Sequence, residues 1–310
     1  MIEAKRNGGP ARAGSGGAEK GGAALIETVR MAEDYLKRRG VDSPRLSAEL
    51  LLAKVLGCGR LDLYMRFDER LGEEDLGGYR TVLKRRADHY PLQYLIGSVE
   101  FYSLPFAVRE GVFIPRPETE LLVEWVEEAF DGERGARFIE FGVGSGVIAG
   151  SLARRHPGWR GFAFDKSKEA VALSKENLER LEIGKERVSV FAADGFEAVS
   201  AAGAFDLLVA NPPYIPTGSI GALQREVSLY ENRAALDGGA DGLSFYPLLA
   251  ASGRRILRPG GMIALEIGDG QGGRVFRILE EAGFERIDVR KDYNGRERLA
   301  AAFIPVSRGA

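Results

Sequence analysis

The sequence is poor in residues that build disulfides and metal sites, with one cysteine, Cys58, and two histidines, His89 and His156, in 310 residues. A lone cysteine cannot form a disulfide within the chain, and the two histidines lie far apart in sequence. We therefore expect no metal site. No apolar run approaches the ~20 residues of a membrane-spanning helix, and the amino terminus lacks the apolar core of a signal peptide. This pattern predicts a cytoplasmic protein without a membrane partner.

The chain also lacks an excess of charge of either sign. Its formal net charge is −2 and its isoelectric point is about 6.0, so no overall positive potential attracts nucleic acid. A local basic patch is still compatible with this balance. Hydrophobic residues make up 45% of the chain, which is ample for a packed core, and the length suggests two domains. We expect a monomer.

The pattern along the chain predicts four segments. Residues 1–22 are rich in glycine and alanine, which predicts a disordered extension. Residues 23–90 have apolar residues at helical spacings and predict a small helical domain. Residues 91–115 contain short apolar runs around a turn and predict a β-hairpin linker, and residues 116–310 form the last domain. The predicted apolar positions of the helical domain include Leu25, Val29, Met31, Leu36, Leu46 and Leu51.

From residue 136 onward strands and helices alternate, which indicates a mostly parallel sheet covered on both faces. A turn is predicted at 258–261. The last two strands are joined only by a short turn around Asn294-Gly295. They must be antiparallel, because a parallel crossover needs a dozen or more residues. The predicted strands are 137–141, 162–164, 188–191, 205–210, 262–267, 287–290 and 299–304.

The first of these strands is followed by Gly142-Val143-Gly144-Ser145-Gly146 and then by a helix. Glycine permits a tight turn and lets a ligand approach the backbone closely, although such a run alone is also compatible with a plain strand-to-helix turn. Asp165 ends the next strand about 20 residues on, where a carboxylate can accept hydrogen bonds from both ribose hydroxyls. Asp194 follows the third strand and is placed to receive an adenine amino group. The three strand ends together predict a nucleotide-like cofactor.

The fourth predicted strand ends in Asn211-Pro212-Pro213-Tyr214. The two prolines fix φ and remove two N–H donors, so the loop is stiff and rich in acceptors. The Asn211 side-chain oxygen and the Pro212 carbonyl can together accept both hydrogens of a planar –NH2 group, and the Tyr214 ring offers it a flat surface. The motif predicts chemistry on an amide or an exocyclic amine; the plain alternative is a proline-rich turn after a core strand.

Two cofactors fit a glycine-rich loop of this kind. NAD prefers the spacing Gly-x-Gly-x-x-Gly with phosphate contacts at a helix amino end, whereas residues 142–146 have a tighter spacing. An amine-binding loop has no part in hydride transfer but suits methyl transfer. S-adenosylmethionine is therefore the predicted cofactor.

Together these motifs resemble those of the HemK or PrmC family, the protein-(glutamine-N5) methyltransferases that modify class I peptide-chain release factors. The resemblance runs from about residue 25 to about residue 305. Its most specific parts are Ile-Pro-Arg-Pro-Glu-Thr-Glu at 114–120 and Asn-Pro-Pro-Tyr-Ile-Pro at 211–216. The other matching stretches are 91–97, 101–102, 142–146, 238–243, 265–268 and 291–296.

The resemblance implies an α/β, Rossmann-like fold of the class I S-adenosylmethionine-dependent methyltransferases. In that fold a seven-stranded, mostly parallel sheet with an antiparallel last strand follows a small helical domain that helps to dock the release factor. The implied reaction is methylation of the N5 nitrogen of a glutamine in a GGQ-type target. By position, residues 142–146 would line the methionine part of the cofactor, Asp165 would bind ribose, and Asn211 to Tyr214 would hold the glutamine amide.

Several positions depart from the usual family pattern. Glu140 replaces the usual aspartate before the glycine-rich loop, and Val143 replaces a threonine. Lys166 stands where an apolar residue is usual, and Asn232 stands where proline is common. These changes concern cofactor affinity more than the reaction.

A further departure lies on the predicted adenine side of the site. Gly195 follows Asp194 at a position where the family often has a large residue against the adenine. We therefore expect Phe196, or the backbone alone, to form that wall.

Two other functions are compatible with these residues. Methylation of an exocyclic amine on DNA or RNA would use Tyr214 to stack on a flipped base. The near-neutral composition and the lack of a basic, aromatic recognition segment argue against it. A non-enzymatic scaffold that only binds the cofactor would leave the Asn211 loop without a role.

Overall fold

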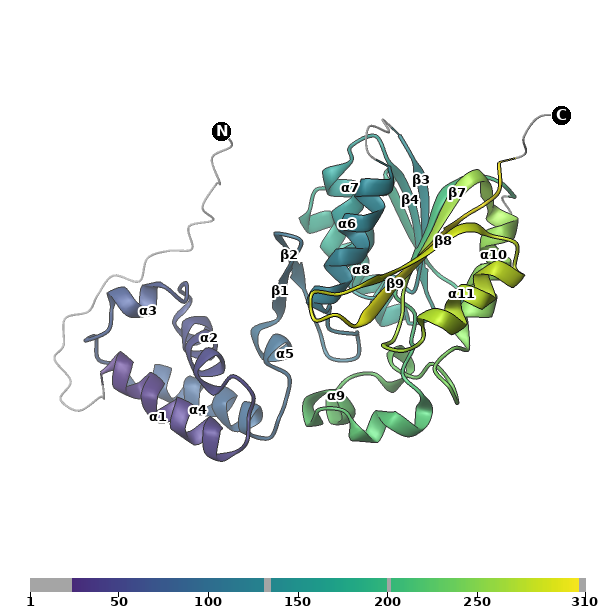
Figure 1. The fold of residues 1–310 in the computed structure, drawn as a ribbon. Helices are drawn as coiled ribbons and strands as arrows, with labels where there is room; N and C mark the ends of the chain where they lie inside the picture. Colours follow the sequence, from purple (N-terminus) through teal and green to yellow (C-terminus); the bar gives the residue numbers. More distant parts are fainter. Residues whose placement is uncertain (1–23, 131–134, 200–201, 307–310) are drawn as a thin grey trace. The chain divides into compact units, whose positions relative to one another are not determined.

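The protein was analysed as a computed structural model that describes residues 24–130, 135–199 and 202–306. The chain forms two compact units that divide between Asp88 and His89 (Figure 1). The extension predicted for residues 1–22 lies outside the described residues.

The first unit is helical in its described residues. Leu25, Val29 and Leu36 are buried as their spacing predicts, whereas Met31 is 57% exposed. Its inclusion in the apolar face was wrong because Met31 lies two positions after Val29, about 200° further around the helix. Leu46, at 37% exposed, is likewise only partly covered. The helices are α1 (Leu25–Arg38), α2 (Pro44–Leu56), α3 (Asp62–Met65) and α4 (Glu73–Ala87).

A buried carboxylate links the helices of this unit. Glu49 of α2 is 1% exposed and accepts hydrogen bonds from Arg45 Nε and Arg60 Nε, both at 2.7 Å, and from the Tyr64 hydroxyl at 2.5 Å. Burial alone would raise the pKa of Glu49, but the bonds from Tyr64, Arg45 and Arg60 outweigh it and lower the pKa. The ionised carboxylate thus ties α2 to α3.

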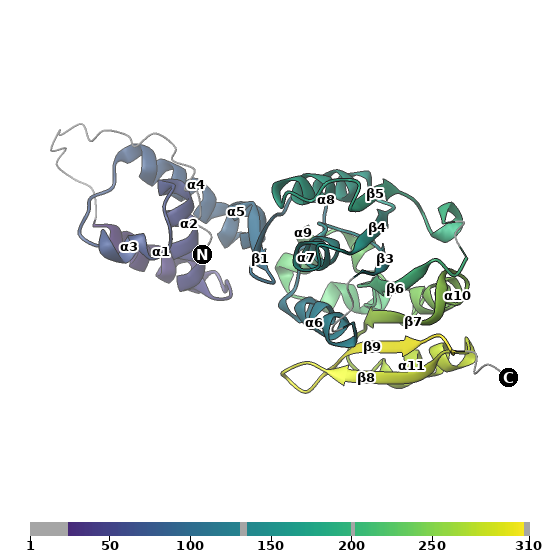
Figure 2. The same cartoon turned by 90° about the horizontal axis from the view of Figure 1, so that it is seen from above.

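The second unit contains, among its described residues, a seven-stranded sheet in the order β5-β4-β3-β6-β7-β9-β8 (Figures 1 and 2). Strands β3 to β7 are parallel, and β9 is antiparallel to both of its neighbours. This confirms the predicted fold with its antiparallel last strand. The strands are β3 (Arg137–Phe141), β4 (Arg160–Asp165), β5 (Val188–Ala192), β6 (Phe205–Ala210), β7 (Leu257–Glu266), β8 (Glu285–Lys291) and β9 (Glu297–Phe303).

Helices cover both faces of this sheet. Consecutive residues of β6 face opposite ways: Leu207 packs in the layer of α6 to α8, and Leu208 packs in the layer of α10 and α11. Both are fully buried, which explains why β6 is a continuous apolar run rather than an alternating one. The helices on one face are α6 (Glu120–Ala129), α7 (Val147–Arg155) and α8 (Lys168–Arg180), and those on the other are α10 (Phe245–Ile256) and α11 (Gly272–Glu281).

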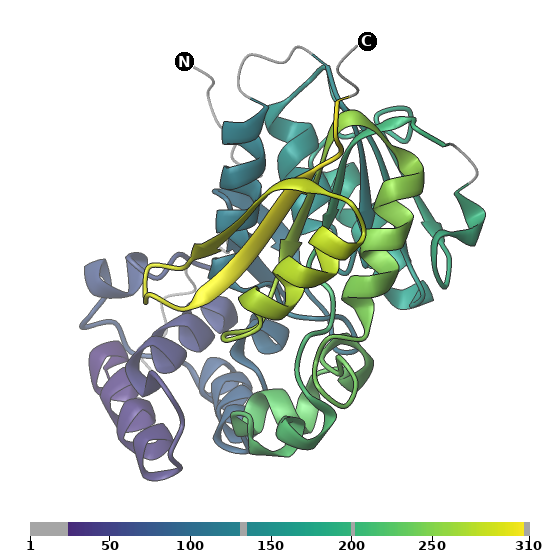
Figure 3. The same cartoon turned by 45° about the vertical axis from the view of Figure 1, so that its right-hand side comes forward.

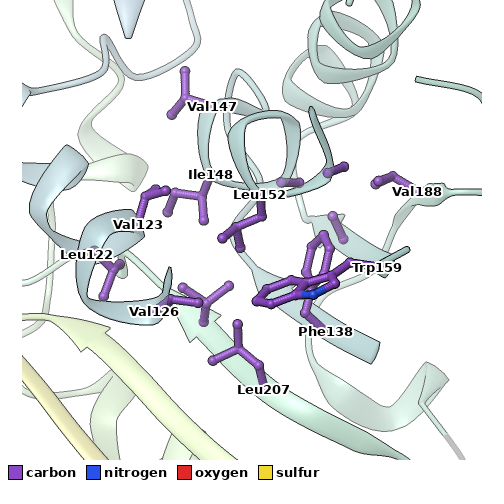
Figure 4. Packing of buried hydrophobic residues seen from close by; sticks show 14 of the residues in the cluster. Leu122, Val123, Val126, Phe138, Val147, Ile148, Leu152, Trp159, Val188 and Leu207 are labelled. Carbon is purple, nitrogen blue, oxygen red and sulfur yellow. The ribbon is translucent and has the colours of Figure 1, made fainter. Parts of the chain in front are cut away.

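Figure 4 shows the first of these layers from close by. Val126 of α6 and Leu152 of α7 pack with Phe138 of β3 and Leu207 of β6, and all four are fully buried. Close packing of this kind fixes the height at which each strand ends.

The segment predicted as a turn at 258–261 lies inside β7. Pairing between β6 and β7 steps from Phe205–Leu257 to Leu207–Met262, so five positions of β7 are spanned by two of β6. The predicted turn is therefore accommodated as a bulge within the strand rather than before it.

Shorter elements complete the second unit. Strands β1 and β2 pair antiparallel and form the hairpin predicted within residues 91–115. Pro117 begins a short 3-10 helix, η1, that leads into α6. These elements are α5 (Leu92–Ile96), β1 (Ser98–Phe101), β2 (Leu104–Ala107), η1 (Pro117–Thr119), η2 (Phe196–Ala198), η3 (Thr217–Ala222), α9 (Arg225–Tyr230) and η4 (Arg233–Ala235).

The strand order reverses at β3, which has β4 on one side and β6 on the other. At such a switch point, ligands bind in the crevice at the carboxyl ends of the strands. Because β3 to β7 are parallel, the loops that follow them meet at this edge. Strand β8 runs in the same direction, so the turn between β8 and β9 also lies at this edge (Figure 3, yellow).

Candidate active site

The glycine-rich loop leaves β3 as a tight, open turn. Gly142, Gly144 and Gly146 have φ values of 72°, 53° and 83°, which only glycine adopts without strain. A Cβ added to Gly142 or Gly144 would have no neighbour within 4 Å, so the space beside these two residues is open. The loop therefore offers bare backbone to a ligand.

The two other residues of this loop point inward. Val143 is 2% exposed and Ser145 is 3% exposed, so their side chains are not open to a ligand. Asn177 of α8 donates to the Ser145 carbonyl oxygen at 2.8 Å and exchanges two hydrogen bonds with Ala107 of β2. It fixes the loop from behind. Its signal in the sequence was a polar residue at helical spacing from the apolar positions that α8 buries.

Asp165 at the end of β4 is joined to the glycine-rich loop. Its Oδ2 accepts the Gly144 N–H at 3.0 Å, and its Oδ1 accepts the Ser167 N–H at 2.9 Å. The carboxylate therefore lies beside the open backbone, and a ribose contact for it stays a prediction. Glu140, fully buried below, accepts the Ala149 N–H at 2.9 Å near the start of α7, and burial raises the pKa of Glu140.

On the predicted adenine side, the three residues differ in exposure. Asp194 is exposed and its Oδ2 accepts a hydrogen bond from Lys166 Nζ at 2.7 Å. Gly195 has a φ of 137°. Phe196 is 2% exposed and stacks on Phe141 with ring centroids 5.7 Å apart. The Phe196 ring thus lies in the core, and an adenine contact for it stays a prediction.

The Asn211-Pro212-Pro213-Tyr214 loop follows β6 beside the glycine-rich loop and is held at its backbone. Gln271 Nε2 donates to the Tyr214 carbonyl oxygen at 2.9 Å, and Ile215 N–H donates to the Leu236 carbonyl oxygen at 3.0 Å. A Cβ on Gly238 would lie 2.8 Å from the Pro213 carbonyl oxygen, and one on Gly242 would lie 2.3 Å from that of Tyr214. This close approach explains the glycines of the 238–243 stretch.

The side chains of this loop end on a buried carboxylate that sequence reasoning assigned no role. Asn211 Nδ2 donates to Thr119 Oγ1 at 3.1 Å, and the Thr119 hydroxyl donates to Glu266 Oε2 at 2.6 Å. The Tyr214 hydroxyl donates to Glu266 Oε1 at 3.1 Å. Burial raises the pKa of Glu266, and the bonds from Thr119 and Tyr214 oppose this without cancelling it. One carboxylate thus holds both ends of the motif.

The network continues to the turn between β8 and β9. Arg298 of β9 reaches the Tyr214 hydroxyl at 3.5 Å and Asp292 Oδ2 at 3.4 Å. Asp292 Oδ1 accepts the N–H groups of Asn294 and Arg296, and these bonds, chiefly that of Arg296, lower the pKa of Asp292. The matching stretch at 291–296 is therefore a rigid turn joined to the site.

Two further residues singled out in the sequence, Arg116 and Asn232, have structural roles. Arg116 pairs with Glu231, whose Oε2 also accepts the Ile114 N–H at 3.4 Å. Asn232, where the family often has proline, donates to the Gly111 carbonyl oxygen at 3.0 Å and caps η4 through the Ala234 N–H at 3.0 Å. This departure therefore replaces a rigid ring with two hydrogen bonds.

In the described part of the chain, no three side chains of the metal-binding kind converge on a common point. No helix in that part is both long and apolar enough to cross a bilayer. The site offers open backbone, a carboxylate at the end of β4 and a stiff loop of acceptors.

Comparisons with known proteins agree with this arrangement. The family model for the PrmC N-terminal domain matches residues 27–97, and that for the methyltransferase small domain matches residues 106–226. Release factor glutamine methyltransferase from Geobacter sulfurreducens is 41% identical, covering 90% of this chain and 98% of that protein. The protein of the same name from Moorella thermoacetica is 42% identical, covering 90% and 97%.

Among solved structures, the hMettl16 catalytic domain in complex with a MAT2A 3′UTR hairpin is 15% identical with a TM-score of 0.54, and the match covers 76% of this chain and 83% of that one. This likeness concerns the fold alone. The relatives match over nearly their whole length at far higher identity. The chain therefore belongs to the release factor glutamine methyltransferase family.

Proposed function

We propose that this protein transfers the methyl group of S-adenosylmethionine to the N5 side-chain nitrogen of a glutamine in class I peptide-chain release factors. The observation that carries the proposal is the position of the Asn211 loop. It follows β6 at the same sheet edge where the glycine-rich loop follows the neighbouring strand β3. An amide held by that loop would lie beside the cofactor, and the relatives' shared name supports the choice of substrate.

The residues of the glycine-rich loop fit the cofactor. The open space beside Gly142 and Gly144 is what a Cβ would fill, and it leaves room for the methionine part. In the proposal Asp165 holds the ribose hydroxyls, while Asp194 and the Gly195 backbone hold the adenine. When bound, the cofactor supplies a methyl group on a positively charged sulfonium.

The loop after β6 orients the substrate. An amide nitrogen is a poor nucleophile, since its lone pair is conjugated with the carbonyl. Asn211 Oδ1 and the Pro212 carbonyl oxygen accept the two hydrogens of the glutamine –NH2 and turn the lone pair toward the methyl group. The same two acceptors stabilise the nitrogen as it gains positive charge. Tyr214 and Pro213 confine the plane of the amide, so orientation and electrostatics replace base catalysis in the transfer step. The methylated nitrogen is then positively charged and strongly acidic, and it loses one of its two hydrogens as a proton to water.

The proposal extends to the whole chain. Residues 23–90 form the domain that helps to dock the release factor, 91–115 form a linker and 116–310 form the methyltransferase domain. The match of residues 27–97 to the PrmC N-terminal domain supports this division. The protein would act as a monomer in the cytoplasm.

The test is methyl transfer from labelled S-adenosylmethionine to purified, unmethylated release factor, with DNA and RNA as parallel acceptors. We expect label on one glutamine of the release factor and on neither nucleic acid. Label on DNA or RNA alone would support the nucleic-acid alternative. Bound cofactor without transfer to any acceptor would support the scaffold alternative.

A further inference from the structure

Thr119 and Glu266 lie directly behind the proposed amide site, yet the reaction as described uses neither. Thr119 is 2% exposed and Glu266 is 0% exposed, so neither can touch a substrate. Hydrogen bonds connect Asn211 to Thr119 and Thr119 to Glu266. Each hydrogen bond runs from a donor to an acceptor, so the order of donors and acceptors in this series constrains the orientation of the Asn211 side chain.

The direction follows from donor chemistry. An ionised carboxylate only accepts hydrogen bonds, so the single hydrogen of the Thr119 hydroxyl must point to Glu266. That leaves only lone pairs of Thr119 facing Asn211. Asn211 must therefore turn its –NH2 group to Thr119, and its oxygen faces the other way. The orientation of an asparagine amide is ordinarily hard to assign from atom positions. Here the hydrogen bonds from Asn211 to Thr119 and from Thr119 to Glu266 decide it.

We propose that Thr119 and Glu266 are positioning residues that keep the Asn211 oxygen turned toward the substrate amide. The proposal rests on the proposed function, since it concerns an amide –NH2 as the group to be held. With the opposite orientation, Asn211 would present its own –NH2 to the substrate –NH2. Two donors would then face each other, and the substrate nitrogen would lose an acceptor.

A purely structural role for this pair explains less. The loop backbone already has other partners: Gln271 holds the Tyr214 carbonyl oxygen, and the Gln271 side chain itself accepts the Gly268 N–H at 2.8 Å. A carboxylate buried with hydroxyl groups as its direct hydrogen-bond partners costs free energy relative to an apolar side chain. Glu266 incurs this cost at a place where it contacts both ends of the Asn-Pro-Pro-Tyr motif. One carboxylate oxygen accepts from Thr119, which in turn accepts from Asn211, and the other oxygen accepts from Tyr214.

The test is a double-mutant cycle on single-turnover methylation of release factor at saturating cofactor. Thr119→Val removes the hydroxyl at nearly constant volume. We expect about a 10-fold slower rate, the scale of one hydrogen bond, about 1.4 kcal/mol, with little change in cofactor affinity. Thr119→Ser keeps the hydroxyl and should keep most of the rate. In an Asn211→Ala background, Thr119→Val should cause no further loss, because it acts only through Asn211.

Thr28→Val is the matched control. Thr28 of α1 is 5% exposed and its hydroxyl donates to the Ala24 carbonyl oxygen at 3.1 Å, so it loses an equivalent bond away from the site. If Thr119→Val folds poorly, as a lowered melting temperature would show, Thr119→Ala and Thr119→Ser repeat the comparison. A wild-type rate without the Thr119 hydroxyl, or a full 10-fold loss on top of Asn211→Ala, would overturn the inference. If wild-type protein fails to methylate release factor, the proposed function fails instead.

Discussion

Two of the buried glutamates, Glu49 and Glu266, differ in the kind of group that contacts the carboxylate. Glu49 in the helical unit has two guanidinium groups as direct partners, and its pKa is lowered by Tyr64, Arg45 and Arg60 despite burial. Glu266 in the second unit has two hydroxyl groups as close partners, and burial raises its pKa. The first carboxylate is an ion-pair partner that joins helices. Glu266 instead orients the hydroxyl hydrogens of Thr119 and Tyr214, and through them it can position side chains for the reaction.

The largest expected effect comes from removing the end of the Glu266 network. Asn211→Ala deletes the proposed acceptor for the substrate amide, and removal of one positioned polar group typically costs about 2.7–4 kcal/mol, or roughly a hundredfold to a thousandfold in rate. Cofactor affinity should fall far less, because the glycine-rich loop and Asp165 are intact. Single-turnover methylation of release factor checks the first quantity, and calorimetry with S-adenosylmethionine checks the second. A near-normal rate would remove Asn211 from the reaction.

The next largest effect separates cofactor binding from amide positioning. Asp165→Ala removes a carboxylate from the end of β4, and the loss of hydrogen bonds to a charged acceptor should weaken cofactor binding by about 1.5–3 kcal/mol. The Glu266 network is untouched by this change. The rate at saturating cofactor should therefore be closer to the wild-type rate than that of Asn211→Ala. Unchanged affinity by calorimetry would exclude Asp165 from the site.

Asp165 and Asn211 also show how much of the site can be predicted from the sequence. Asp165 and Asn211 end predicted strands, and parallel strands bring their carboxyl ends to one edge, so their proximity follows from the order of elements alone. The seven strands and the antiparallel β9 followed from apolar runs and from a short turn that no parallel crossover could span. Periodicity and chain order were enough to predict a mostly parallel sheet with an antiparallel last pair, whereas the class of the fold came from the family resemblance.

The polar network could not be predicted in the same way. Thr119 and Glu266 are 147 positions apart, and their contact depends on the height at which η1 meets the end of β7. Phe196 shows the same difficulty: its burial against Phe141 depends on packing that no spacing rule describes. Side-chain partners across elements are decided by tertiary packing, whereas strand ends are decided by chain order.

Matched substitutions distinguish the roles of the two glutamates. Glu49→Gln places an amide –NH2 where arginine donors now point, so it should lower the free energy of unfolding by about 1–3 kcal/mol and leave the rate nearly unchanged. Glu266→Gln removes a negative charge whose burial already costs free energy, as the raised pKa of Glu266 indicates. It should change stability by less than about 1 kcal/mol but slow methyl transfer, since glutamine no longer forces the direction of the Thr119 hydroxyl.

Chemical denaturation and single-turnover rates on the same two variants provide the measurement. The expected result is a crossed pattern, with stability lost in one variant and rate lost in the other. If both variants lose stability without a change in rate, Glu266 is structural like Glu49, and the contrast drawn between them is wrong.

The smallest expected effect is a dependence on pH that belongs to Glu266. The groups that face it are Thr119 and Glu118 on η1, Tyr214 after β6 and Arg298 on β9. Because burial raises the folded-state pKa of Glu266, the carboxyl binds a proton at a pH above its usual range. The protonated carboxyl can donate to Thr119 and reverse the direction of the network. The rate should therefore fall as pH falls, to about half at the folded-state pKa of Glu266.

Stability should move differently over the same range. A carboxyl with a raised pKa favours the folded state when protonated, so Glu266 adds stability as pH falls toward its usual pKa. Glu49 has a lowered pKa, so the stability that it contributes is lost progressively as pH falls from its usual pKa through that lowered value. The rate should thus decline while the melting temperature holds.

Glu140→Gln is the control, because the pKa of buried Glu140 is also raised. If Glu266 causes the decline in rate at acid pH, this variant should keep it. If the decline disappears in Glu140→Gln, Glu140 causes it instead.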